Sequence, residues 1–102
     1  MEIRRGTTPT ICIEIPDEID TSKITAAYVA LNQDGTEIEK NIEDLTITEQ
    51  ILSFVLTQDE TLEFNSLING WVQVRLRLTS GTALASQKEV LKILPVLKEG
   101  TI

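Results

Sequence analysis

The 102-residue chain contains no histidine and a single cysteine. Histidine is the commonest acid, base and zinc ligand near neutral pH, so its absence argues against most acid–base, zinc and Ser-His or Cys-His chemistry. Cys12 has no partner for an internal disulfide, and we interpret it as a small apolar filler on a strand. The sequence gives no indication of an enzyme.

Aromatic residues and long apolar runs are also scarce. The four aromatic side chains are Tyr28, Phe54, Phe64 and Trp71. Apolar runs such as residues 54–56 fall far short of the roughly 18 residues that a membrane-spanning helix needs. Residues 1–5 carry two arginines without an apolar stretch behind them, which does not match a secretory signal. We therefore expect the protein to be cytoplasmic when it is synthesised.

The net charge of −7 is distributed unevenly along the chain. Residues 1–70 contain fourteen acidic and four basic residues, whereas residues 71–102 contain two acidic and five basic residues. The acidic balance argues against nucleic acid and anionic membrane as partners. The simplest interpretation is solubility together with salt bridges between early and late strands. The alternative is head-to-tail assembly, in which an acidic edge of one copy meets a basic edge of the next.

A β-strand is clearest at residues 71–78, where apolar and polar side chains alternate. Successive side chains of a strand point to opposite faces, so this alternation indicates a half-buried strand. Similar segments recur about every ten residues, as in small β-sandwiches. We predict further strands at residues 10–15, 24–32, 36–42, 45–48, 51–56 and 82–94. Ile38 and Ile42 are expected to face the core, and the irregular alternation at residues 86–90 indicates a bulge.

Two local motifs connect these strands. Asp34-Gly35 is a strong hairpin signal. Thr57 and Glu60 have the spacing of a capping box, which predicts a short helical turn near residues 58–66. Leu62, Phe64 and Leu67 are then expected to pack beneath it.

The expected fold is an all-β, immunoglobulin-like antiparallel sandwich of about seven strands. It forms one domain over residues 1–102, with an N-terminal arm at residues 1–8 and a C-terminal tail at residues 96–102. About 41% of the residues are hydrophobic, which is sufficient for one core.

No catalytic, cofactor or metal site is predicted. The acidic cluster between Glu14 and Asp20 lacks the ligand spacing and central glycine of an EF-hand loop. The candidate partner contacts are Arg4, Arg5, Thr7, Thr8, Trp71, Arg75 and Arg77. The segment 4–9 forms either a docking arm or a structured turn. Trp71 either anchors a partner or is partly covered within the fold. Arg75 and Arg77 either bind a carboxylate or phosphate or pair with glutamates on a neighbouring strand.

Four stretches together resemble a known family: Arg4-Arg-Gly-Thr-Thr-Pro-Thr10, Leu56-Thr-Gln-Asp-Glu-Thr-Leu62, Val72-Gln-Val-Arg75 running on to Gly81–Ser86, and Val96–Ile102. These are small, roughly hundred-residue proteins encoded in phages and prophages of Gram-positive bacteria. The resemblance spans nearly the whole chain, although a threonine is expected where Cys12 stands. It implies a structural component associated with a tail or baseplate, without catalytic residues.

The leading hypothesis is a non-enzymatic structural or assembly module that contacts itself or other phage structural proteins, and is a virion component when assembled. Residues 4–9 and 96–102 are the expected contact segments. The alternative is a small carbohydrate- or ligand-binding module, and an enzyme ranks last.

Overall fold

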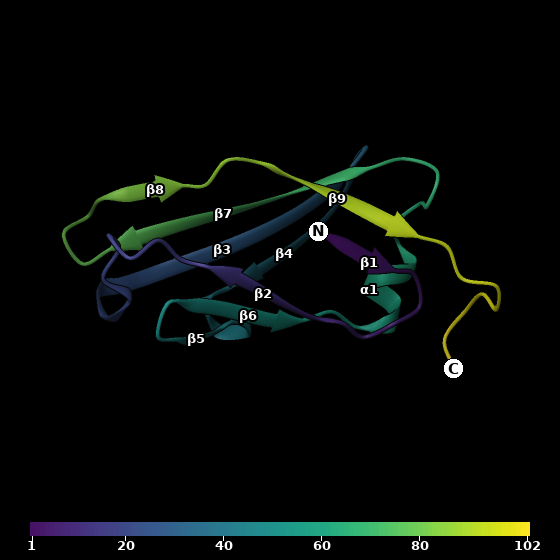
Figure 1. Ribbon diagram of the computed structural model, residues 1–102, viewed down its shortest axis with the longest axis horizontal. Coiled ribbons are helices and arrows are strands. Elements are labelled where there is room, and N and C mark those ends of the chain that lie inside the picture. The colour runs from purple at the N-terminus through teal and green to yellow at the C-terminus, as the bar shows by residue number, and fades with distance from the viewer.

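The computed structural model describes all 102 residues and consists of two packed β-sheets (Figure 1). The larger sheet has six strands: β1 (Glu2–Arg4), β9 (Glu89–Leu94), β7 (Gly70–Leu78), β3 (Ile24–Gln33) and β4 (Thr36–Asn41) lie in this order, and β8 (Ala83–Ala85) also pairs with β7. The smaller sheet has the order β2 (Thr10–Glu14), β6 (Ile51–Val55) and β5 (Thr46–Thr48). The helices are α1 (Gln58–Leu62), η1 (Thr21–Lys23) and η2 (Ile42–Asp44).

This strand order is that of an immunoglobulin-like sandwich. The larger sheet carries one added strand, β4, next to the central pair of β7 and β3. The predicted all-β sandwich is therefore confirmed. All strand pairs are antiparallel except β1 with β9, which is parallel. The sequence analysis did not predict β1. None of the helices has the length or apolar character required to cross a bilayer.

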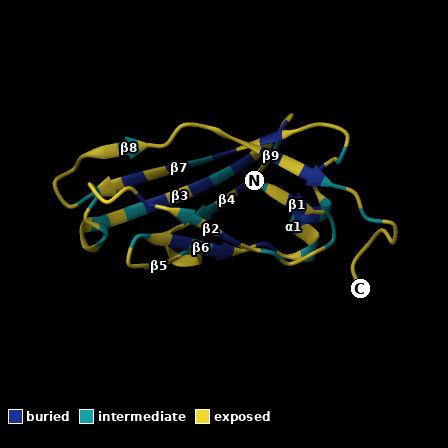
Figure 2. Ribbon diagram, in the orientation of Figure 1, coloured by how far each residue is buried: buried dark blue, intermediate teal, exposed yellow.

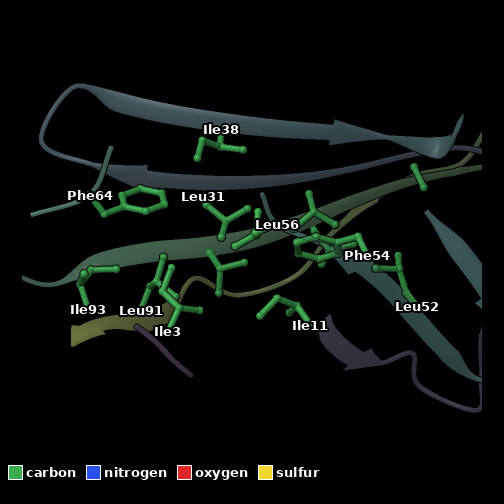
Figure 3. Close-up of a cluster of buried hydrophobic side chains, with 14 of the residues drawn as sticks. Ile3, Ile11, Leu31, Ile38, Leu52, Phe54, Leu56, Phe64, Leu91 and Ile93 are labelled. Atoms are coloured by element: carbon green, nitrogen blue, oxygen red, sulfur yellow. The ribbon is translucent and has the colours of Figure 1, made fainter. Parts of the chain in front are cut away.

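Period-two burial builds the core, as predicted. Along β7, Val72, Val74 and Leu76 are buried while Trp71 and Arg75 are exposed, which Figure 2 shows as alternating bands. The core contains sixteen buried apolar side chains, and Figure 3 shows those of both sheets meeting in one layer. Fully burying one such side chain contributes roughly 1.5–3 kcal/mol, so this layer is the main source of stability.

Three expected core positions are wrong. Ile42 lies in η2 and is 37% exposed, because the chain leaves β4 at Asn41 before Ile42 can continue the alternation. Leu67 is 87% exposed in the loop between α1 and β7, whereas Phe64 is buried as expected. Cys12 is exposed rather than a filler, because its neighbours Ile11 and Ile13 take the inward positions of β2.

The predicted hairpin and bulge are both present. Asp34 and Gly35 have φ values of 42° and 92°, the left-handed conformations that a two-residue hairpin turn between β3 and β4 requires. The last strand is divided into β8 and β9. Between them the Ser86 hydroxyl, rather than its carbonyl, accepts the Val74 N–H at 2.9 Å. The Ser86 N–H still donates to the Val74 carbonyl, and pairing with β7 resumes at Glu89 opposite Val72, with one extra residue on this strand.

The capping box predicted from Thr57 and Glu60 is also confirmed. The Thr57 hydroxyl accepts the Glu60 N–H at 3.1 Å, and the Glu60 carboxylate accepts the Thr57 N–H at 2.9 Å. The helix is shorter than expected and ends at Leu62. Lys40, on β4, donates to the Glu60 carboxylate at 2.8 Å, which ties α1 to the larger sheet.

Candidate interaction surface

The charges of the chain are mostly left without partners inside it. The three ion pairs join the Met1 amino group to Glu89, Arg5 to Glu99, and Lys40 to Glu60. None of them joins an acid of residues 1–70 to a base of residues 71–102. Two of them do join the start of the chain to its end, as predicted, but each pairs an early base with a late acid, so the charge imbalance remains on the surface.

Four of the unpaired charges lie on the solvent-facing side of β4 and β7, the strands on either side of β3. We define the outer face by six exposed side chains on this side: Tyr28, Glu37, Glu39, Trp71, Arg75 and Arg77. They are exposed because Ala27, Val29 and Leu31 on β3, and their partners on the adjacent strands, occupy the opposite, core-facing side. The outer face thus combines two aromatic rings with both signs of charge.

The strand register fixes where these charges lie. Glu37 and Glu39 on β4 lie opposite Asn32 and Ala30 of β3. Arg75 and Arg77 on β7 lie opposite Tyr28 and Ala26, at the other end of β3. The acids and bases consequently occupy opposite corners of the outer face, with Tyr28 between them.

The middle of the outer face is hollowed on both sides of Tyr28. One hollow is bounded by Ala26, Tyr28 and Arg77, and the other by Ala30, Tyr28 and Glu39, and Arg75 lines both. The small alanine side chains leave this space beside the ring. Tyr28 is 45% exposed, so it stands as a ridge between two depressions.

Trp71 lies at the edge of the same face and is 44% exposed. The Lys88 Nζ is 5.1 Å from the centroid of its indole ring, a cation–π contact. The ring is thus partly covered within the fold, and the area left exposed faces solvent, so its role as a partner anchor stays a prediction.

The N-terminal candidate residues lie elsewhere and are mostly engaged within the chain. The Arg5 guanidinium donates to the carbonyls of Phe64 and Leu62 at 2.8 and 3.1 Å. Arg4 donates to the Pro95 carbonyl, and the Thr7 hydroxyl donates to the Arg4 carbonyl at 2.7 Å. With residues 2–4 in β1, the first eight residues are part of the sandwich and not an arm. This corrects the predicted arm and favours the structured turn.

Thr8 is exposed near the same turn. The structure therefore brings Trp71, Arg75 and Arg77 together on the outer face and separates them from Arg4, Arg5, Thr7 and Thr8. Tyr28, Glu37 and Glu39 also belong to this surface and were not among the predicted contact residues. These residues alternate with Ala27, Val29 and Ile38, and this alternation could have indicated that they face solvent. Both faces of β3 lack charged side chains, however, so its sequence did not show which face is buried.

An apolar groove lies apart from the outer face, where β2 and β8 border the opening between the sheets. Its volume is about 230 Å³, and Ile13, Ile15, Ile19 and Leu84 are among its lining residues. No strand pairs with the outer edge of β2 or of β8. Glu14 is the one ionisable side chain in its lining.

Two carboxyl groups have shifted pKa values, and both cap helices. Hydrogen bonds from the hydroxyl and N–H of Ser22 lower the pKa of Asp20, which caps η1. Burial acts to raise the pKa of Glu60, but hydrogen bonds from Lys40 and the Thr57 N–H outweigh it and lower the pKa. Both pKa shifts thus reflect hydrogen bonds that stabilise the first turn of a helix. The structure also contains no group of three or more Cys, Asp or Glu side chains arranged to hold a metal ion.

Comparisons with known proteins add little to this picture. No protein-family model matches the chain, and no curated protein matches it. Among solved structures, the chain is similar to the immunoglobulin-like domain of mouse leukocyte-associated immunoglobulin-like receptor 1, in a strand-swapped dimer. The two share 21% identity over 92% of this chain and 86% of that one, with a TM-score of 0.48. A likeness at this level says nothing about partners, and the strand order defines the fold.

Proposed function

We propose that this domain is a non-enzymatic module that mediates protein–protein contacts in a tail or baseplate-type assembly of a phage or prophage. The outer face is the observation that carries the proposal. It presents Tyr28, Trp71 and two arginines, the residue types in which protein interfaces are enriched. The phage setting rests on the resemblance of four sequence stretches and not on the fold. The partners are other phage structural proteins or further copies of this chain.

The immunoglobulin-like scaffold suits this role because its sheets hold the exposed side chains rigidly. The backbone of β3 is paired on both sides, with β4 and with β7, so Tyr28 is presented from a central strand. A preorganised surface loses less conformational freedom on binding than a loop does.

The proposal is tested in particles purified from the encoding strain after prophage induction, with this protein quantified by mass spectrometry. The protein is expected in the particles, and the double variant Tyr28→Ala, Trp71→Ala is expected to be incorporated at least about tenfold less, since interface aromatics are frequent hot spots. The matched control is Val55→Ala, Leu67→Ala, which removes two exposed apolar side chains outside the outer face. Its incorporation should equal that of the wild type. A wild-type protein that is abundant in cells but absent from particles contradicts the proposal.

The carbohydrate-binding alternative draws on the same two exposed rings, since sugars stack on aromatic side chains. Lys88 already lies over the Trp71 ring, which reduces the ring area left for a sugar and favours a protein partner. Saturable binding on a glycan array that is lost in Trp71→Ala would reverse this ranking.

A further inference from the structure

We propose that the partner of the outer face is a second copy of this chain, docked face to face in a twofold-symmetric dimer. In this dimer Glu37 and Glu39 of each copy lie against Arg75 and Arg77 of the other. The inference rests on the proposed function of the outer face as an interaction surface, and it adds the identity and the orientation of the partner.

These four charges have no cross-strand neighbour of opposite charge in their own chain, although Arg75 lines the same hollow as Glu37 and Glu39. The cross-strand neighbours of Arg75 are Tyr28 and Ala85, and those of Arg77 are Ala26 and Ala83. The neighbours of Glu37 and Glu39 on β3 are Asn32 and Ala30, and β4 is the last strand of its sheet. None of the four takes part in an ion pair of the chain. Each charge is available to a partner.

The pattern of charge on the outer face is complementary to itself. The acids lie beside the end of β3 near residues 30–32, and the bases lie beside the end near residues 26–28. A twofold axis lying between two such faces, and passing between these corners, places the acidic corner of each copy on the basic corner of the other. Symmetry makes both contacts at once, which is how an isologous interface closes.

The shape of the centre agrees with this orientation. Tyr28 lies near the middle of the outer face, with a hollow on either side where Ala26 and Ala30 leave space. Near a twofold axis, the Tyr28 ring of each copy can fill a hollow of the other. The face thus offers an aromatic contact at the centre and charge pairs at two corners.

The same geometry distinguishes a closed dimer from a head-to-tail chain of copies. Open head-to-tail assembly needs two different complementary surfaces on one molecule. Here both signs of charge lie on one face of one sheet. Association therefore ends at two copies, and the dimer is the unit that enters a larger assembly.

The test is charge reversal with cross-rescue, measured by sedimentation velocity at low and high salt. The wild type is expected to dimerise, more weakly as salt rises. The variants Glu37→Lys, Glu39→Lys and Arg75→Glu, Arg77→Glu each place like charges against each other, so each alone is expected to dimerise roughly 100-fold more weakly. An equimolar mixture of the two variants restores opposite charges at both corners and is expected to form a heterodimer of wild-type affinity. Neither variant creates a like-charge neighbour across the strands of its own chain, so both are expected to fold.

The matched control for the glutamate variant is Asp17→Lys, Glu18→Lys, which makes the same change of net charge at two exposed residues between β2 and η1. At high salt it should leave dimerisation within about twofold of the wild type, because these residues lie outside the outer face and exposed charges are then strongly screened. A wild type that remains monomeric, or variants that do not rescue each other, overturns the dimer. If such a protein is still incorporated into particles through its outer face, the proposed function stands and only the identity of the partner is wrong. If the protein dimerises through its outer face but is absent from particles, the dimer stands and the proposed function is wrong.

Discussion

At the scale of single residues, Gln33 shows how a polar side chain can hold a core together. It is 3% exposed. Its amide donates to the carbonyls of Asn65 and Ile68 at 2.6 and 2.8 Å and accepts the Asn65 N–H at 2.6 Å. These bonds fix the loop that leads from α1 into β7, and hence the end of β7 that carries Trp71.

Replacing this side chain is therefore expected to be costly. Gln33→Ala leaves one N–H and two carbonyls of the loop without partners, and should lower the free energy of unfolding by about 3 kcal/mol. Urea denaturation measures this change. The control is Gln73→Ala on the outer face, where one exposed bond to the Ser86 carbonyl is lost, and the expected loss is below about 1 kcal/mol. Equal losses in the two variants would contradict the assigned role of Gln33.

The sequence did not reveal this residue. A glutamine beside an Asp-Gly turn ordinarily indicates solvent exposure, and its burial depends on a loop that lies 32 residues further along the chain. The alternation on β7 was readable because it is local: Arg75 and Arg77 were predicted to share one strand face, and they do. The partners of such a face depend on neighbouring strands, which local pattern does not specify.

At the scale of elements, strands with strong alternation or with turn motifs were predicted nearly to the residue. The three-residue β1 was missed because so short a segment shows no periodicity. Its pairing with β9 is parallel and joins opposite ends of the chain. Helix α1 was found from its capping box, because that motif satisfies helix N–H groups within four residues.

The cap of α1 leads to a prediction about pH. The pKa of Glu60 in the folded protein is lowered from its ordinary value of 4.5. A carboxyl group with a lowered folded pKa stabilises the protein fully above its unfolded pKa, and this stabilisation is lost as the pH falls through the folded value. Glu60→Gln should therefore destabilise the protein by roughly 1 kcal/mol at pH 7, and the difference from the wild type should shrink below pH 4.5.

Urea denaturation of both proteins at pH 7 and at pH 3 measures this difference. Glu63→Gln is the matched control, because it removes the same charge at the C-terminal end of the helix without touching Lys40. A difference between Glu60→Gln and the wild type that is the same at both pH values would contradict the coupling.

At the scale of the whole molecule, the sequence showed an imbalance of charge but not where it lies. Acidic early residues and basic late residues suggested internal salt bridges. Folding instead places Glu37 and Glu39 on an edge strand, separated from Arg75 and Arg77 by β3. The molecule measures 47 × 24 × 19 Å, and the larger sheet, which contains β3, β4 and β7, runs along its longest dimension (Figure 1). The surface that we assign to partners is thus created by topology, since it is assembled from strands that are distant in sequence.

The most direct test of association through the outer face is a concentration series of ¹H–¹⁵N correlation spectra of the wild-type protein. We expect the amide signals that shift with concentration to belong to β3, β4 and β7, with the largest changes around Tyr28, Glu39 and Arg75. Shifts confined to the sheet of β2, β5 and β6, or to residues 4–9 and 96–102, would show that the molecule associates through a different surface and would contradict the account.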